Sequence, residues 1–379
     1  MDLIVYDSEL NELGIIDEFK SLVWTPRFYE VGSFELRAPM TENNIALLRK
    51  NRYLYRPDAE ETVFIKSISE TLQDGERLII VSGAFLEGLL DKRTITHKGY
   101  SSSMRDTLKK YIEDIQGYYS FGYPGMSVEI ADDEDINKWD MESVIGKNLG
   151  DYTRPLLRAE NRAVKIDFYP AEKRMVCRVV SGADRTDVVF SSENLNLYNT
   201  EYNYSEEGCY SLVECFAVVK DEEAERDPAK EKMLYAAMGG RDYSGSQQVS
   251  GLELTNYYEV IEAVIVKEEK TTYDDEGNPQ TVIIKKVDYE TTHENLLAIC
   301  KQHYQPYTEN FSGTAVGGGF RSEWHLGDIV TIEDTARGTS YQKQIEEVTE
   351  VFEAGTKRVD VLFGAPMRTV IDLIKEVKR

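Results

Sequence analysis

The sequence predicts an α+β protein that is predominantly β, with two similar small β-barrel domains in tandem, a helix-containing insertion and a C-terminal helix. Alternation is the first observation: Phe34, Leu36 and Ala38 are separated by charged residues, which is the period of two of a half-buried strand. The second is the abundance of tyrosine, 24 residues, because its ring favours strands and its hydroxyl suits protein interfaces. The third is a strand pattern that occurs twice.

Residues 1–97 are expected to form the first barrel domain. Trp24 and Phe28 are expected to share one face of a strand, and Gly32-Ser33 is expected to turn that strand into the next. Asp74-Gly75 indicates a hairpin turn. The other expected elements are strands at 53–55, 63–68 and 77–81, a short helix capped by Thr41 with Ile45, Leu47 and Leu48 on its apolar side, and helical turns at 84–90.

Residues 98–163 change character and are expected to form the helix-containing insertion. Apolar residues between Met104 and Ile115 recur with helical spacing, which predicts an amphipathic helix. A second helix is expected over 155–162, with Pro155 in its first turn, where a missing N–H is tolerated.

Residues 164–365 are expected to form the second β region, which includes the second barrel. A helix is predicted over 293–304, with Leu296, Leu297 and Cys300 facing inward. The expected strands are 164–169, 174–180, 187–190, 211–219, 257–267, 281–287 and a final block from 327, and a solvated loop is expected at 221–232.

Residues 366–379 are expected to form the C-terminal helix. Its apolar stripe consists of Val370, Ile371, Ile374 and Val377. The stripe suits either a place in the chain's own core or a docking element for a neighbouring molecule.

Two parts of the chain share one strand pattern. The aligned segments are Ile65–Glu70 with Ile345–Glu350, Arg77–Gly83 with Arg358–Gly364, and Tyr53–Asp58 with Ile329–Asp334. The second copy is expected to need one extra residue in its turn. Any two hairpins resemble each other to some degree; the alternative is two copies of one small barrel in a single chain. Two copies per chain would let three chains form a ring of six similar surfaces.

The charge of the chain bears on its partners. Lys and Arg number 44 against 68 Asp and Glu, a formal net charge of −24. Such a surface repels nucleic acid and anionic lipid, so neither nucleic-acid binding nor membrane insertion is expected. The charge either only keeps the surface solvated or attracts a basic protein partner.

Cysteine spacing and the N-terminus indicate the compartment. Four cysteines without Cys-x-x-Cys spacing are typical of buried thiols in a reducing environment. The chain begins with a strand pattern and not with a cationic, apolar signal segment, so export by a signal peptide is not expected.

The sequence offers no catalytic, cofactor-binding or metal-binding constellation. His293 begins a predicted helix without the second histidine of a zinc-protease motif, and His303 falls on a different helix face. The glycine-rich stretch 313–320 lacks the Lys-Ser/Thr of a phosphate loop and indicates a turn or bulge. Acidic clusters at 132–137 and 274–276 do not match a calcium loop. We therefore expect no enzymatic activity, no cofactor and no metal.

The segment from Trp24 to Pro39 resembles the signature of one family, the central tail-hub proteins of tailed phages and of phage-derived injection particles, which include the siphovirus Gp37-like proteins. In that family a short strand and an aspartate, here Val5-Tyr6-Asp7, precede a Trp-x-x-Arg-Tyr-x-x-x-Gly-x-Phe-Glu-Leu pattern. Phe28-Tyr29 covers the aromatic position in this chain.

A second block is similar to the same family. Gly182–Thr186 resembles its Gly-x-Asp-Arg-Thr turn, and Val188–Ser191 resembles the Val-Phe-Ser strand that follows. The resemblance covers about residues 1–265 and is strongest at 1–93 and 181–199. One departure is Glu214-Cys215, where the family often has Asn before the strand.

The resemblance implies a structural tail-hub or baseplate protein. It implies a homotrimer at the distal end of the tail, made in the bacterial cytoplasm, that adapts the sixfold tail tube to a threefold assembly. The implied partners are the tail tube or distal tail protein on one side and a spike, fibre or tape-measure protein on the other. The particle would be a virion or a bacteriocin-like contractile injection particle.

Two other functions stay open at this point, a tail-tip peptidoglycan or glycan hydrolase and a receptor-binding module. For the structural function, the candidate structural and interface residues are Trp24, Arg27, Tyr29, Phe34, Glu35, Asp184, Arg185, Phe190, Ile371 and Ile374.

Overall fold

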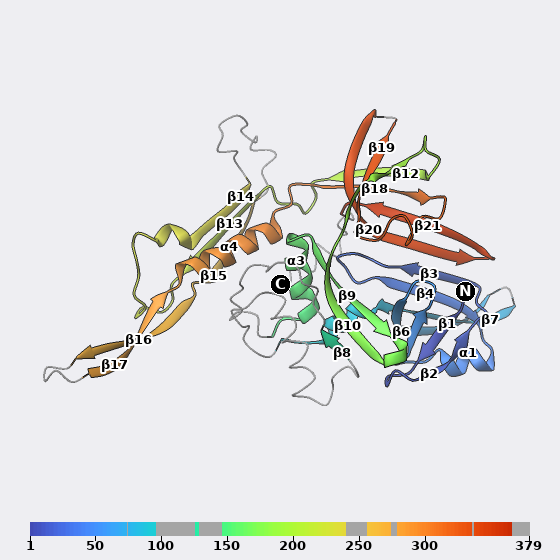
Figure 1. Ribbon diagram of the computed structural model, residues 1–379, viewed down its shortest axis with the longest axis horizontal. Helices are drawn as coiled ribbons and strands as arrows, with labels where there is room; N and C mark the ends of the chain where they lie inside the picture. Colours follow the sequence, from blue (N-terminus) through green and yellow to red (C-terminus); the bar gives the residue numbers. More distant parts are fainter. Residues whose placement is uncertain are drawn as a thin grey trace.

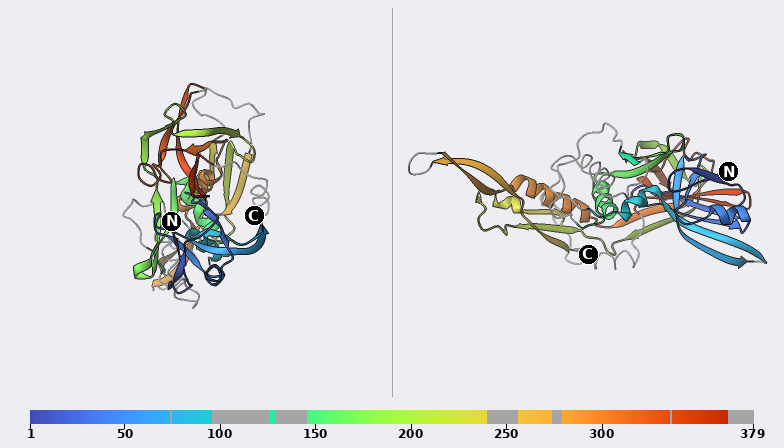
Figure 2. Two further views of the ribbon diagram at one scale, coloured as in Figure 1. Left: turned by 90° about the vertical axis from the view of Figure 1, so that its right-hand side faces the viewer. Right: turned by 90° about the horizontal axis from the view of Figure 1, so that it is seen from below.

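The computed structural model describes residues 1–73, 75–95, 126–128, 146–239, 256–273, 279–335 and 337–365. These residues form an elongated molecule, with a large sheet at one end and a narrow arm at the other (Figures 1 and 2). The N-terminus lies at the sheet end.

Strands from both ends of the chain build the large sheet. The N-terminal module consists of β1 (Leu3–Tyr6), β2 (Glu12–Ile16), β3 (Ser21–Thr25), β4 (Ser33–Pro39), β5 (Tyr53–Arg56), β6 (Glu61–Gln73) and β7 (Glu76–Phe85). The C-terminal module consists of β11 (Asp184–Ser191), β12 (Leu197–Ser205), β18 (Thr308–Ala315), β19 (Ile329–Asp334), β20 (Thr339–Glu353) and β21 (Thr356–Phe363).

The N-terminal module is antiparallel, with strand order β3-β4-β7-β6-β5-β1-β2. In β4, Phe34, Leu36 and Ala38 are buried while the residues between them are partly exposed, as the alternation predicts. The helix α1 (Glu42–Leu47) follows, and the Thr41 hydroxyl caps it by accepting a hydrogen bond from the Asn44 N–H at 3.1 Å.

The C-terminal module has the strand order β12-β18-β21-β20-β19-β11, in which β11 runs parallel to β19 and the other neighbours are antiparallel. Aromatic rings fill its core: the Phe190 ring lies 5.3 Å from that of Trp324 and 4.9 Å from that of Phe363. Pairing of β20 with β3 joins both modules into one sheet, which has 13 strands over the described residues.

A smaller unit lies between the modules and the arm (Figure 1). Its sheet contains β8 (Met126–Val128), β9 (Arg162–Tyr169) and β10 (Arg174–Ser181) in the order β8-β10-β9, with the short η2 (Pro170–Glu172) between β9 and β10. The helix α3 (Leu149–Ala159) and the 3₁₀ helix η1 (Leu86–Lys92) share a core with this sheet, which includes Leu89, Leu157 and Phe168.

The arm is a three-stranded sheet covered on one face by a helix, with a hairpin at its tip (Figure 1). Val213, Cys215 and Cys300 are buried between the sheet and the helix. The arm's elements are β13 (Leu212–Val218), η3 (Glu231–Leu234), β14 (Tyr235–Gly239), β15 (Asn256–Glu262), the hairpin β16 (Ile265–Tyr273) and β17 (Pro279–Val287), and α4 (Tyr289–His303).

The expected class, α+β and predominantly β, is confirmed. The tandem barrels are not: over the described residues the strands of both modules continue as one sheet, and no pairing closes either module on itself. Closure into barrels therefore stays a prediction.

The connection after β3 differs from the prediction. β3 ends at Thr25 and β4 begins at Ser33, so Phe28 lies in a longer connection and not on a strand. Pro26 has no N–H for a strand ladder, and its carbonyl accepts a hydrogen bond from the Val348 N–H at 3.2 Å. The connection is thereby fixed to β20.

The helix predicted over 155–162 runs instead from Leu149 to Ala159. Asn148 caps it, because its Oδ1 accepts a hydrogen bond from the Asp151 N–H at 3.1 Å, and Pro155 therefore lies beyond the first turn. Leu297 of α4 is exposed, whereas Leu296 and Cys300 face the core as expected.

The strand predicted over 257–267 is divided into β15 and β16. The division falls at Ala263 and Val264, where the Ala263 N–H binds the Val218 carbonyl at 2.9 Å and the Val264 N–H binds the Thr292 hydroxyl at 3.0 Å. These bonds redirect the chain from the sheet of the arm into its terminal hairpin.

Several predictions lie outside the described residues. They are the helix between Met104 and Ile115, the acidic clusters at 132–137 and 274–276, and the C-terminal helix with Ile371 and Ile374. Among the helices that the structure describes, none has the length and apolar character to cross a bilayer.

Candidate functional site: the junction of the two modules

The junction between the modules is built on β20, a strand of 15 residues that pairs with two strands along one edge. Its first part, Thr339–Gln344, pairs with β19, and its last part, Glu350–Glu353, pairs with β3. Between these parts, Arg27 forms a bridge with Glu347. One strand thus belongs to both modules and fixes their relative position, as Figure 1 shows for β20 beside β3.

A buried ion pair lies at this junction. Arg56 of β5 donates hydrogen bonds to both carboxylate oxygens of Glu350 in β20, at 2.5 and 3.1 Å, and the side chains are 1% and 0% exposed. Arg56 also pairs with Asp58 at 2.9 and 3.0 Å. The guanidinium therefore contacts carboxylates of both modules.

Further charges complete this network. Arg321 contacts Glu350 at 2.7 Å, and Lys357 contacts it at 2.7 Å as well. Arg321 also donates to Glu61 at 2.9 Å, and the Trp24 indole N–H donates to the same carboxylate at 2.6 Å. Each buried charge has partners, which is the condition under which charges are tolerated in a core.

The electrostatics follow from this arrangement. Burial by itself raises the pKa of Glu350, but the hydrogen bond from Arg56 and the charges of Arg321 and Arg56 outweigh it and lower that pKa to about 2. Glu350 is therefore ionised at neutral pH. Removal of one partner would upset the balance of charge in this buried network, since Glu350 is shared by Arg56, Arg321 and Lys357.

The network was not predicted from the sequence, although a signal exists. Arg56 follows Leu54 by two residues and so lies on the same, buried face of β5. Glu350 has the same relation to Val348 in β20. A charged residue at an inward position of an alternating strand indicates a buried ion pair, but the sequence does not give its partner.

Three residues of the opening motif contact β20 or its neighbours. Trp24 is fully buried opposite Glu350, and Arg27 pairs with Glu347 at 2.5 Å. The Tyr29 hydroxyl donates to Gln344 Oε1 at 2.5 Å. Burial, together with the nearby Glu346, raises the pKa of Tyr29 to about 12, so the hydroxyl keeps its proton. The structure thus brings these three candidates together at one junction.

The other candidates are dispersed. Phe34 lies beside Trp24, with ring centroids 6.0 Å apart, whereas Glu35 pairs with Arg37 on the partly exposed face of β4. Asp184 and Arg185 are at the start of β11, where Arg185 pairs with Asp187 at 3.1 Å near the surface. Phe190 belongs to the core of the C-terminal module.

The two modules contain the same three-stranded arrangement, β5-β6-β7 and β19-β20-β21. A β-bulge falls at the same place in both: the pairing shifts between Ile65 and Ser67 in β6, and between Ile345 and Glu347 in β20. A shared bulge is more specific than the shape of a hairpin, which supports the repeat that the sequence indicated.

The turns that close these hairpins are equally long. Gln73 pairs with Glu76 in the first, and Glu353 pairs with Thr356 in the second. The extra residue expected in the second turn is therefore absent, and Ile79 corresponds to Val359, both of them buried. The sequence comparison aligned Arg77 with Arg358 because the two residues are identical. This alignment placed β21 one residue out of register with β7.

The correspondence extends to the neighbouring strands. Phe34 of β4 pairs with Trp24 on one side and Gly83 on the other. Phe311 of β18 pairs with Tyr202 and Phe363 in the same manner. Tyr202 of β12 therefore occupies the position in the C-terminal module that Trp24 of β3 occupies in the N-terminal module.

Two strand edges, one in each module, have no partner among the described residues. β12 pairs with β18 on one side only, and the last part of β6, residues 67–73, pairs with β7 on one side only. Such edges present backbone N–H and C=O groups to which a further strand can bind.

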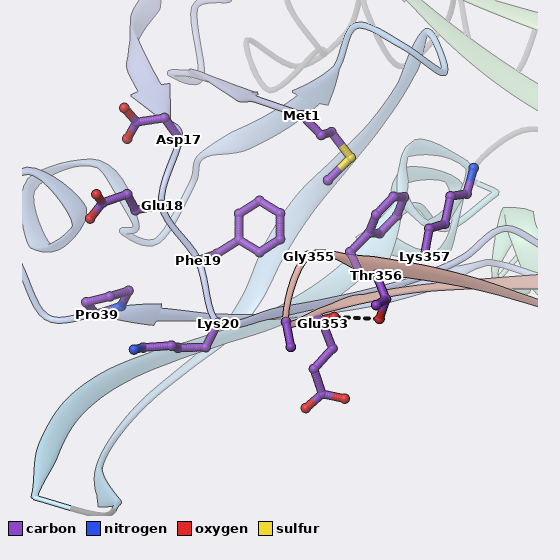
Figure 3. Close-up of a pocket in the computed structure, with 12 residues that line it drawn as sticks. Met1, Asp17, Glu18, Phe19, Lys20, Pro39, Glu353, Gly355, Thr356 and Lys357 are labelled. Atoms are coloured by element: carbon purple, nitrogen blue, oxygen red, sulfur yellow. Dashed lines mark hydrogen bonds between the residues drawn. The ribbon is translucent and has the colours of Figure 1, made fainter.

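A hollow of about 620 Å³ lies beside the junction. Figure 3 shows it between Asp17–Lys20 of the N-terminal module and Glu353–Lys357 at the β20–β21 turn. The Thr356 hydroxyl donates to the Glu353 carbonyl at 2.7 Å and so stabilises the turn that lines the hollow. The lining combines Phe19 with charged residues of both signs and contains no nucleophile beside a base.

The described residues contain no group of three His, Cys, Asp or Glu side chains that could hold a metal ion. His293 contacts the Met233 carbonyl, with Nδ1 3.1 Å from the oxygen, and all four cysteines are buried. Glu87 is a buried carboxyl whose pKa is raised by burial, and Lys165 lies 3.7 Å away. It lies in the core between η1 and β9, where it accepts a hydrogen bond from the Ile166 N–H at 3.4 Å.

Comparison with known families supports the resemblance of the N-terminal region. Residues 2–109 match the family model described as Siphovirus ReqiPepy6 Gp37-like protein. The match contains the N-terminal module and the opening motif around Trp24. The second similar block, at 181–199, lies outside the matched residues and stays a prediction. A comparison with curated proteins found no match.

The whole chain is similar in fold to solved phage tail proteins. Prophage tail protein gp18 from Listeria monocytogenes EGD-e is 14% identical with a TM-score of 0.56, over 100% of this chain and 98% of that one. The 43 kDa tail protein of prophage MuSo2 from Shewanella oneidensis is 12% identical with a TM-score of 0.54, over 96% and 98%. A tail protein from Neisseria meningitidis MC58 is 11% identical with a TM-score of 0.54, over 96% of each chain. At these identities the likeness is one of fold.

Proposed function

We propose that this protein is a structural tail-hub or baseplate component of a tailed phage or a phage-derived particle, and that it functions as a homotrimer. In this role it catalyses no reaction and connects tail components of different symmetry. The fold shared with three prophage tail proteins and the family match over residues 2–109 support a tail role.

The observation that carries the proposal is the joining of two similar modules, edge to edge, within one chain. A contact between unlike edges is head-to-tail, and such contacts generate closed rings when the rotation closes. Three chains would then contribute six similar modules in one ring. This ring of six modules, the module layer, would match a sixfold partner. Parts that occur once per chain, such as the arm, would be arranged with threefold symmetry.

Partners follow from this division. The sixfold partner is the tail tube or distal tail protein, at the distal end of the tail. The threefold partner is a spike, fibre or tape-measure protein, and the arm, present once per chain, is where we place that contact. The face of the arm sheet turned away from α4 exposes Phe216, Tyr258 and Val260, and aromatic side chains are enriched in protein interfaces.

The proposed division into domains is the one expected from the sequence: a first hub domain at 1–97, an insertion at 98–163, a second β region at 164–365 and a terminal helix at 366–379. The junction of β20 with β3 supports it in one respect, since the two hub modules come from the first and third of these segments.

Size-exclusion chromatography with light scattering tests the trimer. The proposal predicts a species of three times 43.3 kDa that persists on dilution into the micromolar range. A chain that remains monomeric up to its solubility limit would contradict it. Clearing of cell-wall substrate in a zymogram by this protein would instead favour a hydrolase.

A further inference from the structure

We propose that the open edge of β6 in one copy binds the open edge of β12 in a second copy, and that Glu70 pairs there with Arg337 as Glu350 pairs with Arg56 inside the chain. The inference rests on the proposed function, because it identifies the contact that would hold the trimer together. The internal junction of β20 with β3 serves as its template.

The first argument concerns one face of β6. The shared bulge and the equal turns place Ile68, Glu70 and Leu72 at the positions of Val348, Glu350 and Phe352 in β20. Val348 and Glu350 are fully buried, and Phe352 is partly buried against the core of the N-terminal module. Ile68 and Leu72, by contrast, are 40% and 68% exposed. The strand face that is buried in β20 at the internal junction is thus exposed to solvent in β6.

The second argument concerns the receiving surface. At the internal junction, the guanidinium carbon of Arg56 lies 5.7 Å from the Trp24 ring, and Arg56 pairs with Asp58. On the C-terminal module, the guanidinium carbon of Arg337 lies 4.2 Å from the ring of Tyr202, the counterpart of Trp24.

The acidic partner of that arginine is also repeated. Arg337 pairs with Asp334 at 2.6 Å, and Asp334 corresponds to Asp58 in the alignment of β19 with β5. An arginine, an aromatic ring and an aspartate therefore recur beside the open edge, although the arginine comes from a different position in the chain. Cation–π contacts and a second carboxylate orient an arginine toward an incoming acid.

The missing member of the repeated arrangement is the glutamate. Inside the chain it is Glu350; its counterpart Glu70 is exposed, and no described residue forms an ion pair with it. Glu70 lies in β6 of the N-terminal module and Arg337 lies in the turn between β19 and β20 of the C-terminal module, and no ion pair joins them within one copy. They can meet when a second copy binds, and their opposite charges favour this pairing over a like-charged alternative.

The template also fixes the register. Glu350 pairs with Trp24 in antiparallel fashion, so Glu70 is expected opposite Tyr202 of the second copy, and Ser69 opposite Asn203. Leu72, next to Glu70 on the same face, would be covered by the second copy as Phe352 is covered within the chain.

Charge reversal tests the pair. Glu70→Arg and Arg337→Glu should each raise the dissociation constant of the trimer about thirtyfold or more, measured by sedimentation velocity. The double variant E70R/R337E should recover most of the wild-type affinity, because the reversed charges attract again. Glu290→Arg on α4 of the arm is the matched control and should leave association unchanged.

A cysteine pair tests the register independently. The double variant S69C/N203C should form intermolecular disulfides under mild oxidation, and the non-reducing gel ladder should end at the trimer. The control pair S69C/E290C should form none. A ladder that continues beyond the trimer, or equal crosslinking of the control, would overturn the proposed contact.

The outcomes separate the two proposals. If the wild type is trimeric but neither charge reversal nor the cysteine pair has the stated effect, the β6–β12 contact is wrong and the trimeric hub stands. If the wild type is monomeric at every concentration, both proposals fail.

Discussion

The carboxylate of Glu350 accepts two hydrogen bonds from the guanidinium of Arg56, at 2.5 and 3.1 Å, although 294 residues separate them in the chain. The pair connects the two modules at a point that water does not reach. Because the direct contact offsets much of the desolvation cost of two buried charges, the pair should be sensitive to single substitutions.

Loss of one member of this pair should destabilise the protein strongly. Glu350→Gln and Arg56→Met are each expected to cost about 3–5 kcal/mol of unfolding free energy, while the double substitution R56M/E350L should cost less than the sum. Urea unfolding measures this. The pair Glu35–Arg37 is the control: it is more than 40% exposed, so Arg37→Ala should cost about 1 kcal/mol or less. Equal losses at both pairs would contradict the account.

The pair should also produce a defined dependence on pH. The folded pKa of Glu350 is about 2, below the ordinary value of 4.5. A depressed carboxyl pKa contributes stability that is fully present above pH 4.5 and is lost as the pH falls toward 2. The melting temperature of the wild type should therefore exceed that of E350Q at pH 6, and the difference should shrink between pH 4.5 and 2. A difference that is constant across this interval would show that Glu350 is not ionised in the fold.

Trp24 should contribute by packing more than by its hydrogen bond. Its ring is fully buried, 5.2 Å from that of Phe85 and 6.0 Å from that of Phe34. Trp24→Ala should cost about 3–5 kcal/mol in chemical denaturation. Trp24→Phe keeps an aromatic ring and loses the N–H donated to Glu61, so its cost should be clearly smaller. If both variants lost the same stability, the hydrogen bond and not the packing would dominate.

Gly182 should not accept a side chain. A Cβ at this position would lie 1.7 Å from the carbonyl oxygen of Gly327, which is backbone and has no alternative rotamer. Gly182→Ala should therefore push β11 away from the β19 region and cost about 1–3 kcal/mol or more. The neighbouring exposed Ser181→Ala is the control in the same thermal melt and should change little. A neutral Gly182→Ala would contradict this close approach of the two backbones.

Local structure could be predicted where the determining residues are close in the chain. The alternation in β4 and the Thr41 cap follow from residues a few positions apart, and both are confirmed. Phe28 was assigned to a strand because its spacing from Trp24 fits an alternating pattern. Its actual place depends on Pro26 and Val348, which are far apart in sequence.

The candidate site shows the same limit. The sequence identified Trp24, Arg27 and Tyr29 by resemblance, and the structure brings them to β20. The sequence did not identify Arg56 and Glu350 as partners, because no pattern of neighbouring residues links two positions so far apart in the chain. The repeat was recognised from similar segments, but its register in β21 could be fixed only by the bulge and turn pairings.

The central claim is that two similar modules in each chain, joined by unlike edges, make a ring of six. Single-particle cryo-electron microscopy of the purified oligomer tests it most directly. The account predicts a threefold particle whose module layer shows six similar lobes, with β20–β3 junctions inside chains alternating with β6–β12 junctions between chains. A particle of another symmetry, or a trimer held together by its arms with the module edges apart, would contradict it.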